Sequence, residues 1–297
     1  MAFFLEVLVG GLLAGTMYSL VALGFVLIYK ASGVFNFAQG SMVFFAVLFF
    51  VGFIDLGVPF WVSLPITIVL MVAVGMITER FVLRPLVSQS EETLLMATIG
   101  LAFVLEGVAQ LAWGVEVRRL DLGIRDEPIG WVMDNAGILV SQLDIVAAVV
   151  ATIMVAALAL LFTRTKVGRG LRAVADDHAA ALSIGIPLKH IWALTWAAAG
   201  VVALVTGMLW GARSGVQFAL IGIALKALPV LIIGGFTSVP GVIVAGLIVG
   251  ASEKIAEVYL GPYVNGGIEG WLPYVMAVLF LLVRPEGLFG EKIIRRV

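Results

Sequence analysis

Long blocks of apolar residues, separated by short polar stretches, follow one another along the whole chain. A bilayer core of about 30 Å requires about 20 apolar residues in one helix, and blocks near this length recur. Several blocks are short or interrupted, so eight spans with one re-entrant or broken segment fit the pattern nearly as well as nine spans. The pattern predicts an all-α, polytopic integral membrane protein with apolar helices at residues 3–29, 41–54, 60–79, 93–113, 142–163, 190–212, 216–236, 240–259 and 271–285.

The composition supports a membrane protein with no soluble domain. Of the 297 residues, 62% are hydrophobic and 12% are charged, whereas soluble chains carry about 25% charged residues. The longest polar connections, at about 114–141 and 164–190, are too short to fold as separate domains without disulfides or metals. We therefore expect one transmembrane permease domain over residues 1–297.

The residue types present exclude several kinds of chemistry. The chain has no cysteine and only two histidines, His178 and His190, which excludes disulfides and thiolate catalysis and argues against a metal site. The phosphate-binding motif G-x-x-x-x-G-K-[ST], the zinc motif H-E-x-x-H and the motif G-x-S-x-G are absent. With a net charge of −1, the chain offers no basic surface for nucleic acid. We expect no catalytic residue, metal or cofactor on this chain.

The charges of the polar connections predict the orientation in the membrane. Basic connections stay in the cytoplasm, and the stretches 79–91 and 164–190 and the C-terminal tail are all basic. The connection 114–141 is rich in acidic residues and is expected outside. This arrangement places the C-terminus in the cytoplasm and, with nine spans, the N-terminus outside.

Pairs of glycines at a spacing of four residues indicate where helices touch. Gly11 and Gly15 form one pair, and Gly246 and Gly250 form another. Glycine at this spacing lets two helix backbones approach closely within a membrane. We predict a packing role for Gly246 and Gly250.

The segment 172–183 is rich in alanine and favours a helix. Gly185 and Pro187 follow it as a stop signal. A helix of this length is too polar to insert in the membrane and too short to be stable alone. It is either a linker helix at the membrane surface or a docking helix for a cytoplasmic partner.

The same segment resembles the coupling loop of the permeases of ATP-binding-cassette (ABC) importers. The likeness rests on residues 172–177, read Arg-Ala-Val-Ala-Asp-Asp, and continues through Ala180, Leu182, Gly185 and Ile186. Further motifs resemble the branched-chain amino-acid (Liv-type) permease family. They are GVFNFAQG at 33–40, ERFVLRP at 79–85, GGFTSVPG at 234–241 and RPEGLFG at 284–290.

This resemblance implies a permease subunit of an ATP-driven importer in the plasma membrane of a prokaryote. Its implied partners are two cytoplasmic ATPase subunits, which would hold the ATP and magnesium, a second permease that is more often a non-identical sister, and an external solute-binding protein. The residues implied to couple the permease to the ATPases are Arg172, Ala175, Asp176, Asp177 and Gly185. The implied substrates are branched-chain or other small amino acids or amides.

One residue departs from the family pattern, because Gln39 stands where the family usually has histidine. Glutamine donates and accepts hydrogen bonds but does not titrate near neutral pH. This argues against a proton-linked role at position 39 and leaves the substrate open between branched-chain amino acids, other amino acids, urea and amides.

Polar residues within or between the apolar blocks are the candidates for the translocation path, because polar groups at membrane depth are costly and tend to be functional. Structural roles compete for several of them: Lys226 is also explained by a carboxylate partner and Asn36 by helix capping, and for Glu106 a structural role is favoured over a place in the path. A similar interruption occurs at 34–40 and 216–222, as in transporters with repeated broken helices. The candidates are Asn36, Gln39, Ser41, Glu106, Gln217 and Lys226.

A stand-alone secondary transporter or channel for a small polar solute is the alternative function. It explains the polar residues inside the apolar blocks. It does not explain a short docking helix or the ordered series of family motifs, so we favour the importer permease.

Overall fold

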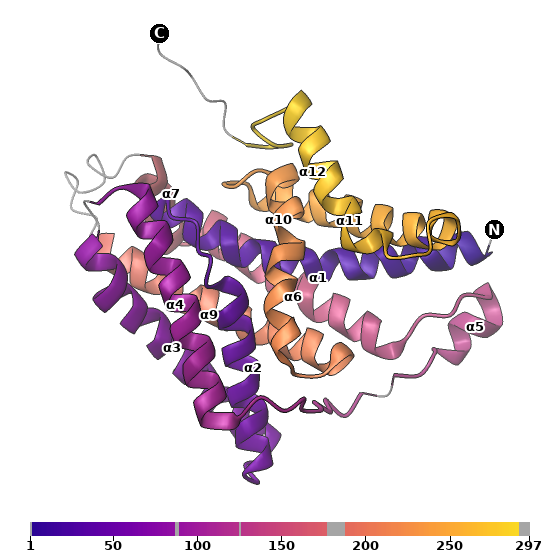
Figure 1. Ribbon diagram of the computed structural model, residues 1–297, viewed down its shortest axis with the longest axis horizontal. Coiled ribbons are helices and arrows are strands. Elements are labelled where there is room, and N and C mark those ends of the chain that lie inside the picture. The colour runs from indigo at the N-terminus through magenta and orange to yellow at the C-terminus, as the bar shows by residue number, and fades with distance from the viewer. Residues whose placement is uncertain (1, 87–88, 125, 177–187, 291–297) are drawn as a thin grey trace. The chain divides into compact units, whose positions relative to one another are not determined.

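The computed structural model is helical and describes residues 2–86, 89–124, 126–176 and 188–290 (Figure 1). Each predicted apolar block is helical, with ends close to the predicted ones except for 216–236, which is a short helical turn followed by a helix that begins at Gly222, so the all-α prediction is confirmed. The helices are α1 (Ala2–Ser32), α2 (Gln39–Asp55), α3 (Phe60–Ile77), α4 (Glu91–Trp113), α5 (Gly130–Ala136), α6 (Gln142–Arg164), α7 (Lys166–Asp176), α9 (Leu188–Ser214), α10 (Gly222–Gly234), α11 (Val239–Leu260) and α12 (Leu272–Val283). Short helical turns extend several of them: η1 (Thr78–Leu83), η2 (Arg84–Leu86), η3 (Phe218–Ile221), η4 (Gly261–Tyr263) and η5 (Ile268–Gly270).

Six of the described helices are long and apolar enough to cross a membrane, which confirms a polytopic membrane protein. Three further apolar helices are shorter, at Gln39–Asp55, Phe218–Gly234 and Leu272–Val283. They correspond to three of the predicted spans. Hydropathy detects the apolar character of such segments, but it does not measure how far a broken or short helix reaches through the membrane.

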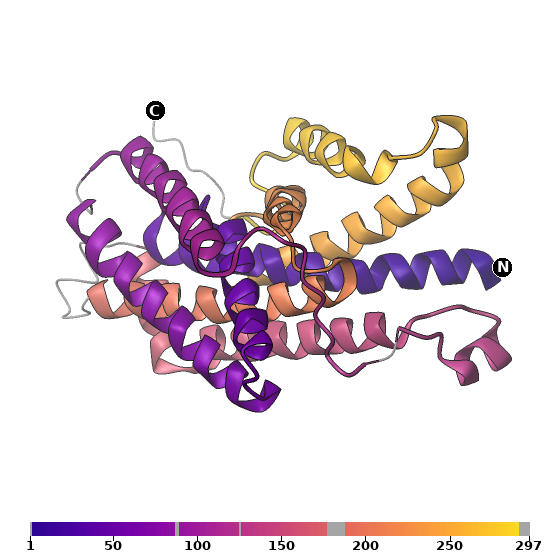
Figure 2. The same cartoon turned by 60° about the horizontal axis from the view of Figure 1, so that its bottom comes forward.

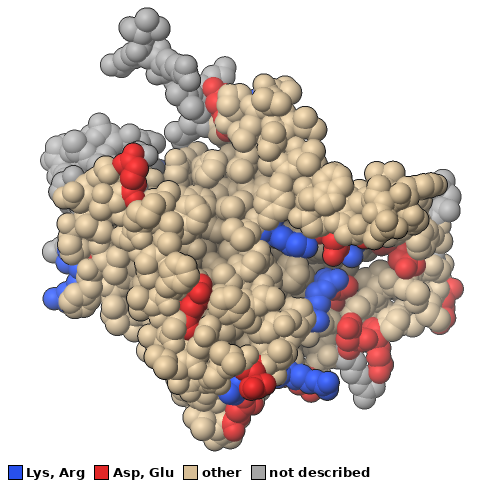
Figure 3. All heavy atoms as spheres, in the orientation of Figure 1, with Lys and Arg blue, Asp and Glu red and all other residues tan. Residues whose placement is uncertain are grey.

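The surface also has the character of a membrane protein. Figure 3 shows one face, on which charged side chains are few and most of the area is uncharged. Large apolar side chains are widely exposed, and Leu111 on α4 is 89% exposed. Such exposure is compatible with stability because lipid is itself apolar.

The chain divides into two compact units, each built from separate stretches of sequence. Unit 1 contains Met1–Leu23, Asp121–Val155 and Leu225–Val297, and unit 2 contains Gly24–Leu120 and Ala156–Ala224. Within unit 2, α2 packs against α3, α4 and α9. A single permease domain over residues 1–297 stays a prediction.

Helices α2 and α4 run parallel in unit 2, as three successive contacts show. Thr98 of α4 is hydrogen-bonded to the segment just before α2, and Glu106 is hydrogen-bonded to Ser41. Further along, the Trp113 ring packs against the rings of Phe49 and Phe53. The two helices therefore face each other through two polar contacts followed by an aromatic one, and this arrangement builds the site described below.

The glycine pairs pack α1 against α11 in unit 1, which confirms the predicted role of Gly246 and Gly250. A Cβ atom on Gly11 would lie 2.7 Å from the Gly250 carbonyl oxygen, and one on Gly15 would lie 3.0 Å from the Gly246 carbonyl carbon. Figures 1 and 2 show the first part of α1 beside α11 from two directions. The hydroxyl of Ser19 also donates to the Val242 carbonyl oxygen at 3.2 Å.

The polar helix α7 begins earlier than the alanine-rich pattern predicts, at Lys166 and not at Arg172. Thr165 is the reason, because its hydroxyl accepts the Gly168 N–H at 3.1 Å and so caps the helix. Arg172 donates to the Phe162 carbonyl oxygen at the end of α6. The predicted C-terminal part of the helix, with Gly185 and Pro187, lies outside the described residues.

We predict that Gly11→Ala lowers the thermal stability of the purified protein, whereas Gly10→Ala does not. The new Cβ at position 11 presses on the α11 backbone, and overpacking costs about 1–3 kcal/mol. A Cβ at position 10 meets nothing within 4 Å, and alanine favours a helix over glycine by about 1 kcal/mol. Thermal unfolding in detergent compares the two variants, and equal stabilities would contradict the packing role.

Candidate functional site

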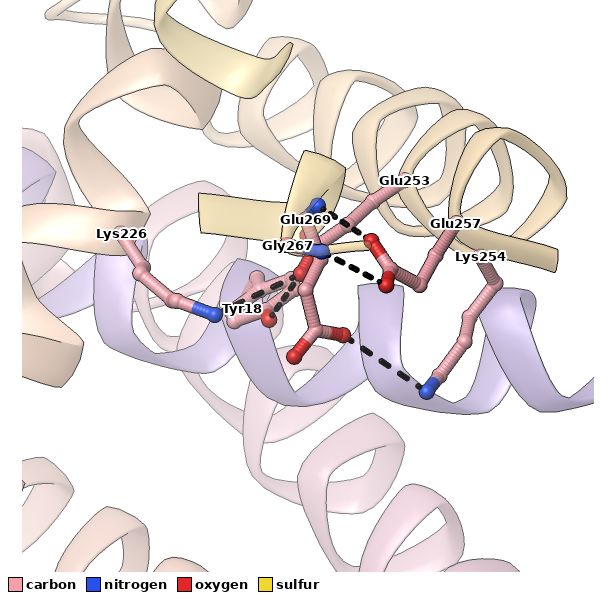
Figure 4. Close-up of polar contacts among 7 residues, drawn as sticks. All are labelled: Tyr18, Lys226, Glu253, Lys254, Glu257, Gly267 and Glu269. Atoms are coloured by element: carbon pink, nitrogen blue, oxygen red, sulfur yellow. Dashed lines mark hydrogen bonds and ion pairs between the residues drawn. The ribbon is translucent and has the colours of Figure 1, made fainter. Parts of the chain in front are cut away.

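A buried ion pair connects three helices of unit 1 (Figure 4). Glu253 of α11 is 4% exposed, and its Oε1 lies 3.6 Å from the Lys226 Nζ of α10. Tyr18 of α1 donates its hydroxyl to the same oxygen at 3.1 Å. Lys226 therefore has the carboxylate partner that one of its two interpretations expects, and its role in a translocation path stays a prediction.

Glu253 was missed by the sequence reasoning, although it is a charged residue inside the predicted helix 240–259. A carboxylate in an apolar block carries the same signal as Lys226. Its Oε2 is buried and has no hydrogen-bond partner in the described part of the chain. Loss of Lys226 would leave this carboxylate without its cation.

Beyond Glu253, a second carboxylate on α11 organises the turn that follows the helix. Glu257 accepts the N–H groups of Gly267 and Glu269, each at 2.9 Å. The Lys254 ammonium lies 3.8 Å from the Glu269 carboxylate (Figure 4). The turn needs such support because Asn265 and the two glycines after it all have positive φ.

The predicted interruption before α2 is present in unit 2, and its amides are fully buried. Asn36 and Gln39 are 1% and 0% exposed. The Asn36 side-chain oxygen accepts the Ala38 N–H at 3.1 Å, and its amide nitrogen lies 3.3 Å from the Gln39 Oε1. Asn36 therefore stabilises the turn before α2, but the N-cap residue of the helix is Ala38, with no side-chain cap.

Gln39 packs against α1 within unit 2. A Cβ on Gly24 would collide with the Gln39 amide, so the glycine leaves room for this side chain. The Gln39 amide nitrogen has no hydrogen-bond partner among the described residues. A role for Asn36 and Gln39 in lining a path stays a prediction.

Thr98 of α4 was also missed by the sequence analysis, although it holds the same interruption. Its hydroxyl accepts the Phe37 N–H at 3.2 Å and lies 3.3 Å from the Phe35 carbonyl oxygen. A single threonine in an apolar block gives no signal of this role, because small polar residues are tolerated in such helices by bonding their own backbone.

Ser41 and Glu106 meet between α2 and α4. The serine hydroxyl donates to the Glu106 Oε1 at 2.6 Å. Ser41 is 1% exposed, and Glu106 is half-buried. Two of the sequence candidates are thereby brought into direct contact.

A cavity of about 290 Å³ lies one helical turn further along both helices. Phe44 of α2 and Gln110 of α4 follow Ser41 and Glu106 at helical spacing. Val115 and Phe218 complete the lining. The rings of Phe44 and Phe218 meet edge to face with centroids 5.9 Å apart, so the wall is mainly apolar with one amide.

Gln217 precedes Phe218, so its backbone lies beside the cavity lining. Its amide donates to the Ser214 carbonyl oxygen at 3.0 Å. Nearby, the backbone of Arg118 forms an antiparallel β-bridge with that of Val216, and its side chain forms an ion pair with Asp55. These contacts hold the segment after α4 against the segment before η3.

The remaining predicted residues are distributed as follows. Asn36, Gln39, Ser41, Glu106 and Gln217 belong to unit 2, whereas Lys226 belongs to unit 1. The coupling residues Arg172, Ala175 and Asp176 lie on α7, and Asp177 and Gly185 lie outside the described residues. Within the described ranges, no group of three or more His, Cys, Asp or Glu residues is placed to hold a metal ion.

Comparison with known proteins gives one family and several relatives. A family model described as the permease component of a branched-chain amino acid transport system matches residues 7–283. The high-affinity branched-chain amino acid transport system permease protein LivH of Escherichia coli K12 is 27% identical, and the alignment covers 99% of this chain and 98% of the relative. BraD of Pseudomonas aeruginosa, described in the same words, is 27% identical over the same shares.

One solved structure is also similar, PsaBC from Streptococcus pneumoniae in complex with Fab. It has a TM-score of 0.43 and 15% sequence identity, and the match covers 94% of this chain and 90% of that one. A likeness at this TM-score is too loose to transfer structural detail.

We predict that Lys226→Met destabilises the protein more than the double variant Lys226→Met/Glu253→Gln. Removing one partner of a buried ion pair costs about 3–5 kcal/mol, and the one-third exposure of the lysine side chain favours the lower end of that range. In the double variant no charge is left uncompensated, and the glutamine still accepts from Tyr18. Thermal unfolding of Lys226→Met, Glu253→Gln and the double variant measures the coupling between the two side chains. Losses of stability that simply add in the double variant would contradict the ion pair.

Proposed function

The chain belongs to the family of branched-chain amino acid transport system permease components, and we propose that it is the transmembrane subunit of an ATP-driven amino-acid importer. The observation that carries the proposal is the family match over residues 7–283, nearly the whole chain. A permease component lets a solute pass through the membrane and does not catalyse a reaction. The multi-pass helical structure agrees with that role.

The proposed substrates are branched-chain amino acids or other small amino acids and amides. The names of the relatives in Escherichia coli and Pseudomonas aeruginosa refer to branched-chain amino acids, which supports this class. Gln39 offers an amide where the family pattern has histidine, so the proposed transport step does not depend on a titrating group at that position.

Proposed partners are two cytoplasmic ATPase subunits, a second permease that is a non-identical sister, and an external solute-binding protein. ATP and magnesium belong to the ATPase subunits. A stand-alone transporter or channel is not favoured, because the matching family consists of components of a larger transport system.

Coupling is proposed to act through α7 and the residues that follow it. The Arg172 side chain bonds the last turn of α6, so a displacement of α7 would pull on an apolar helix. Closure of the ATPase subunits would move α7, and rocking of the two permeases would expose a central path to each side in turn. Arg172, Ala175, Asp176, Asp177 and Gly185 are the proposed contacts.

The proposed path residues are the polar ones within or between the apolar helices. Asn36, Gln39, Ser41 and Glu106 lie on or beside α2 and α4, and Gln217 lies beside η3. Lys226 is the sixth candidate, from α10. Their amide, hydroxyl and charged groups, of which Asn36, Gln39 and Ser41 are buried, suit a small polar solute.

We predict that Asp176→Arg and Gly185→Glu abolish uptake and substrate-stimulated ATP hydrolysis, with at least a tenfold loss, while the permease still inserts in the membrane. Both changes alter the proposed ATPase contact. Asp134→Arg in α5 is the matched control, since it makes the same charge reversal on the connection expected outside. Uptake and ATP hydrolysis in reconstituted complexes measure the effect; normal uptake in both test variants would refute docking at this loop.

Orientation is tested with single cysteines, which the natural chain lacks. We propose that α5 faces outside and α7 faces the cytoplasm. In intact cells, Asp134→Cys should react with a membrane-impermeant maleimide and Arg169→Cys should react only after the cells are opened. The opposite labelling pattern would reverse the proposed orientation.

A further inference from the structure

The cavity of unit 2 has the size and lining of a small-solute site. Its volume of about 290 Å³ is just below the range of about 300–1,000 Å³ that is usual for ligand pockets. Three of its four lining side chains are apolar, namely Phe44, Val115 and Phe218, and the fourth is the amide of Gln110. Such a wall suits an aliphatic group beside one hydrogen-bonding group.

Glu106 lies one turn before Gln110 on the same face of α4, about 6 Å along the helix axis. Its Oε1 accepts from Ser41 at 2.6 Å. No lysine, arginine or histidine of the described ranges lies within 4.0 Å of the carboxylate, and no described group donates to its Oε2. The second carboxylate oxygen of Glu106 is therefore a free acceptor, one turn along α4 from Gln110 of the cavity lining.

Glu106 differs in this respect from two other buried carboxylates, Glu79 and Glu253, each of which has a cation beside it. Glu79 pairs with Arg84 at 2.7 Å, and Glu253 pairs with Lys226 at 3.6 Å. A carboxylate away from water is costly unless a positive charge accompanies it. The missing cation at Glu106 is accounted for if the transported solute supplies it.

We propose that Glu106 binds the α-ammonium group of the transported amino acid and that the cavity holds its aliphatic side chain. This inference rests on the proposed function and names the binding residues for its substrate class. The ammonium group donates to the free Oε2, and the Gln110 amide donates to the substrate carboxylate. The rings of Phe44 and Phe218 and the Val115 side chain contact the aliphatic group.

The proposal also explains selection by size and charge. A cavity of this volume has room for one amino acid and not for a peptide. A charged side chain entering between Phe44 and Phe218 would lose its hydration without a partner, which is unfavourable. Each methylene group that fills the apolar wall adds about 0.8 kcal/mol, or about fourfold in affinity, so leucine is favoured over alanine.

The first test is Glu106→Gln in the complete complex, reconstituted with its ATPase subunits and binding protein and supplied with ATP and radiolabelled L-leucine. Glutamine keeps the acceptor for Ser41 and removes only the charge. Loss of a charged hydrogen bond predicts at least a tenfold fall in uptake. Glu106→Asp keeps the charge and should retain part of the uptake. Glu92→Gln, at the exposed start of the same helix, is the matched control and should transport normally.

The second test measures selectivity, which a purely structural role of this region would not change. Val115→Trp narrows the cavity and should lower L-leucine uptake at least fivefold more than L-alanine uptake. Val117→Trp places the same side chain in the same segment outside the lining and should leave the ratio unaltered. Because the binding protein is the same throughout, a changed ratio reports the permease.

These outcomes separate the inference from the proposed function. Uptake within twofold of wild type in Glu106→Gln, or equal losses of both substrates in Val115→Trp, would overturn the Glu106 site while amino-acid import stands. If Glu106→Gln fails to assemble, the Val115→Trp ratio decides. If the wild-type complex imports neither amino acid, the proposed function and this inference both fall.

Discussion

Close backbone contact between helices is the interaction on which the rest of this structure depends. In lipid, apolar side chains gain little by leaving one apolar surface for another, so helices associate through packing and polar contacts. Gly11 and Gly15 bring α1 directly onto Gly246 and Gly250 of α11. In unit 2, Gly75 and Gly200 similarly bring α3 and α9 within backbone contact. A larger residue at these positions would separate the helices and the polar groups that they carry.

The polar contacts follow from this close approach. Tyr18 lies one turn beyond Gly15 on α1, and it reaches the Glu253 carboxylate because α1 and α11 are packed along these glycines. The ion pair of Glu253 with Lys226 then ties α10, which is interrupted by Pro229, to the same pair of helices. The charge of Glu253, which would be costly in lipid, thereby has a cation and a hydrogen-bond donor inside the unit.

Unit 2 shows how a polar interruption between two apolar helices is held in place. Backbone without helical bonds must be surrounded by protein or line a cavity. The segment before α2 is held by its own Asn36, by Thr98 of α4 and by the space that Gly24 leaves for Gln39. One turn further, the parallel run of α2 and α4 places Ser41 against Glu106 and leaves the cavity between Phe44, Gln110, Val115 and Phe218.

The sequence by itself determined the helices, because apolar length is a local property that each block carries independently of its neighbours. It also singled out Lys226, Glu106 and Asn36, since a polar residue in or beside an apolar block is visible without knowing its partner. The lengths of the broken helices and the partners of these polar residues were decided by the tertiary structure, whereas the cap from Thr165 is a local contact that the alanine-rich pattern did not reveal. Glu253 and Thr98 show why: each acts on residues in a different helix, and hydropathy carries no information on which helix faces which. The cavity beside Glu106 likewise exists only because two helices distant in sequence run parallel at a fixed register.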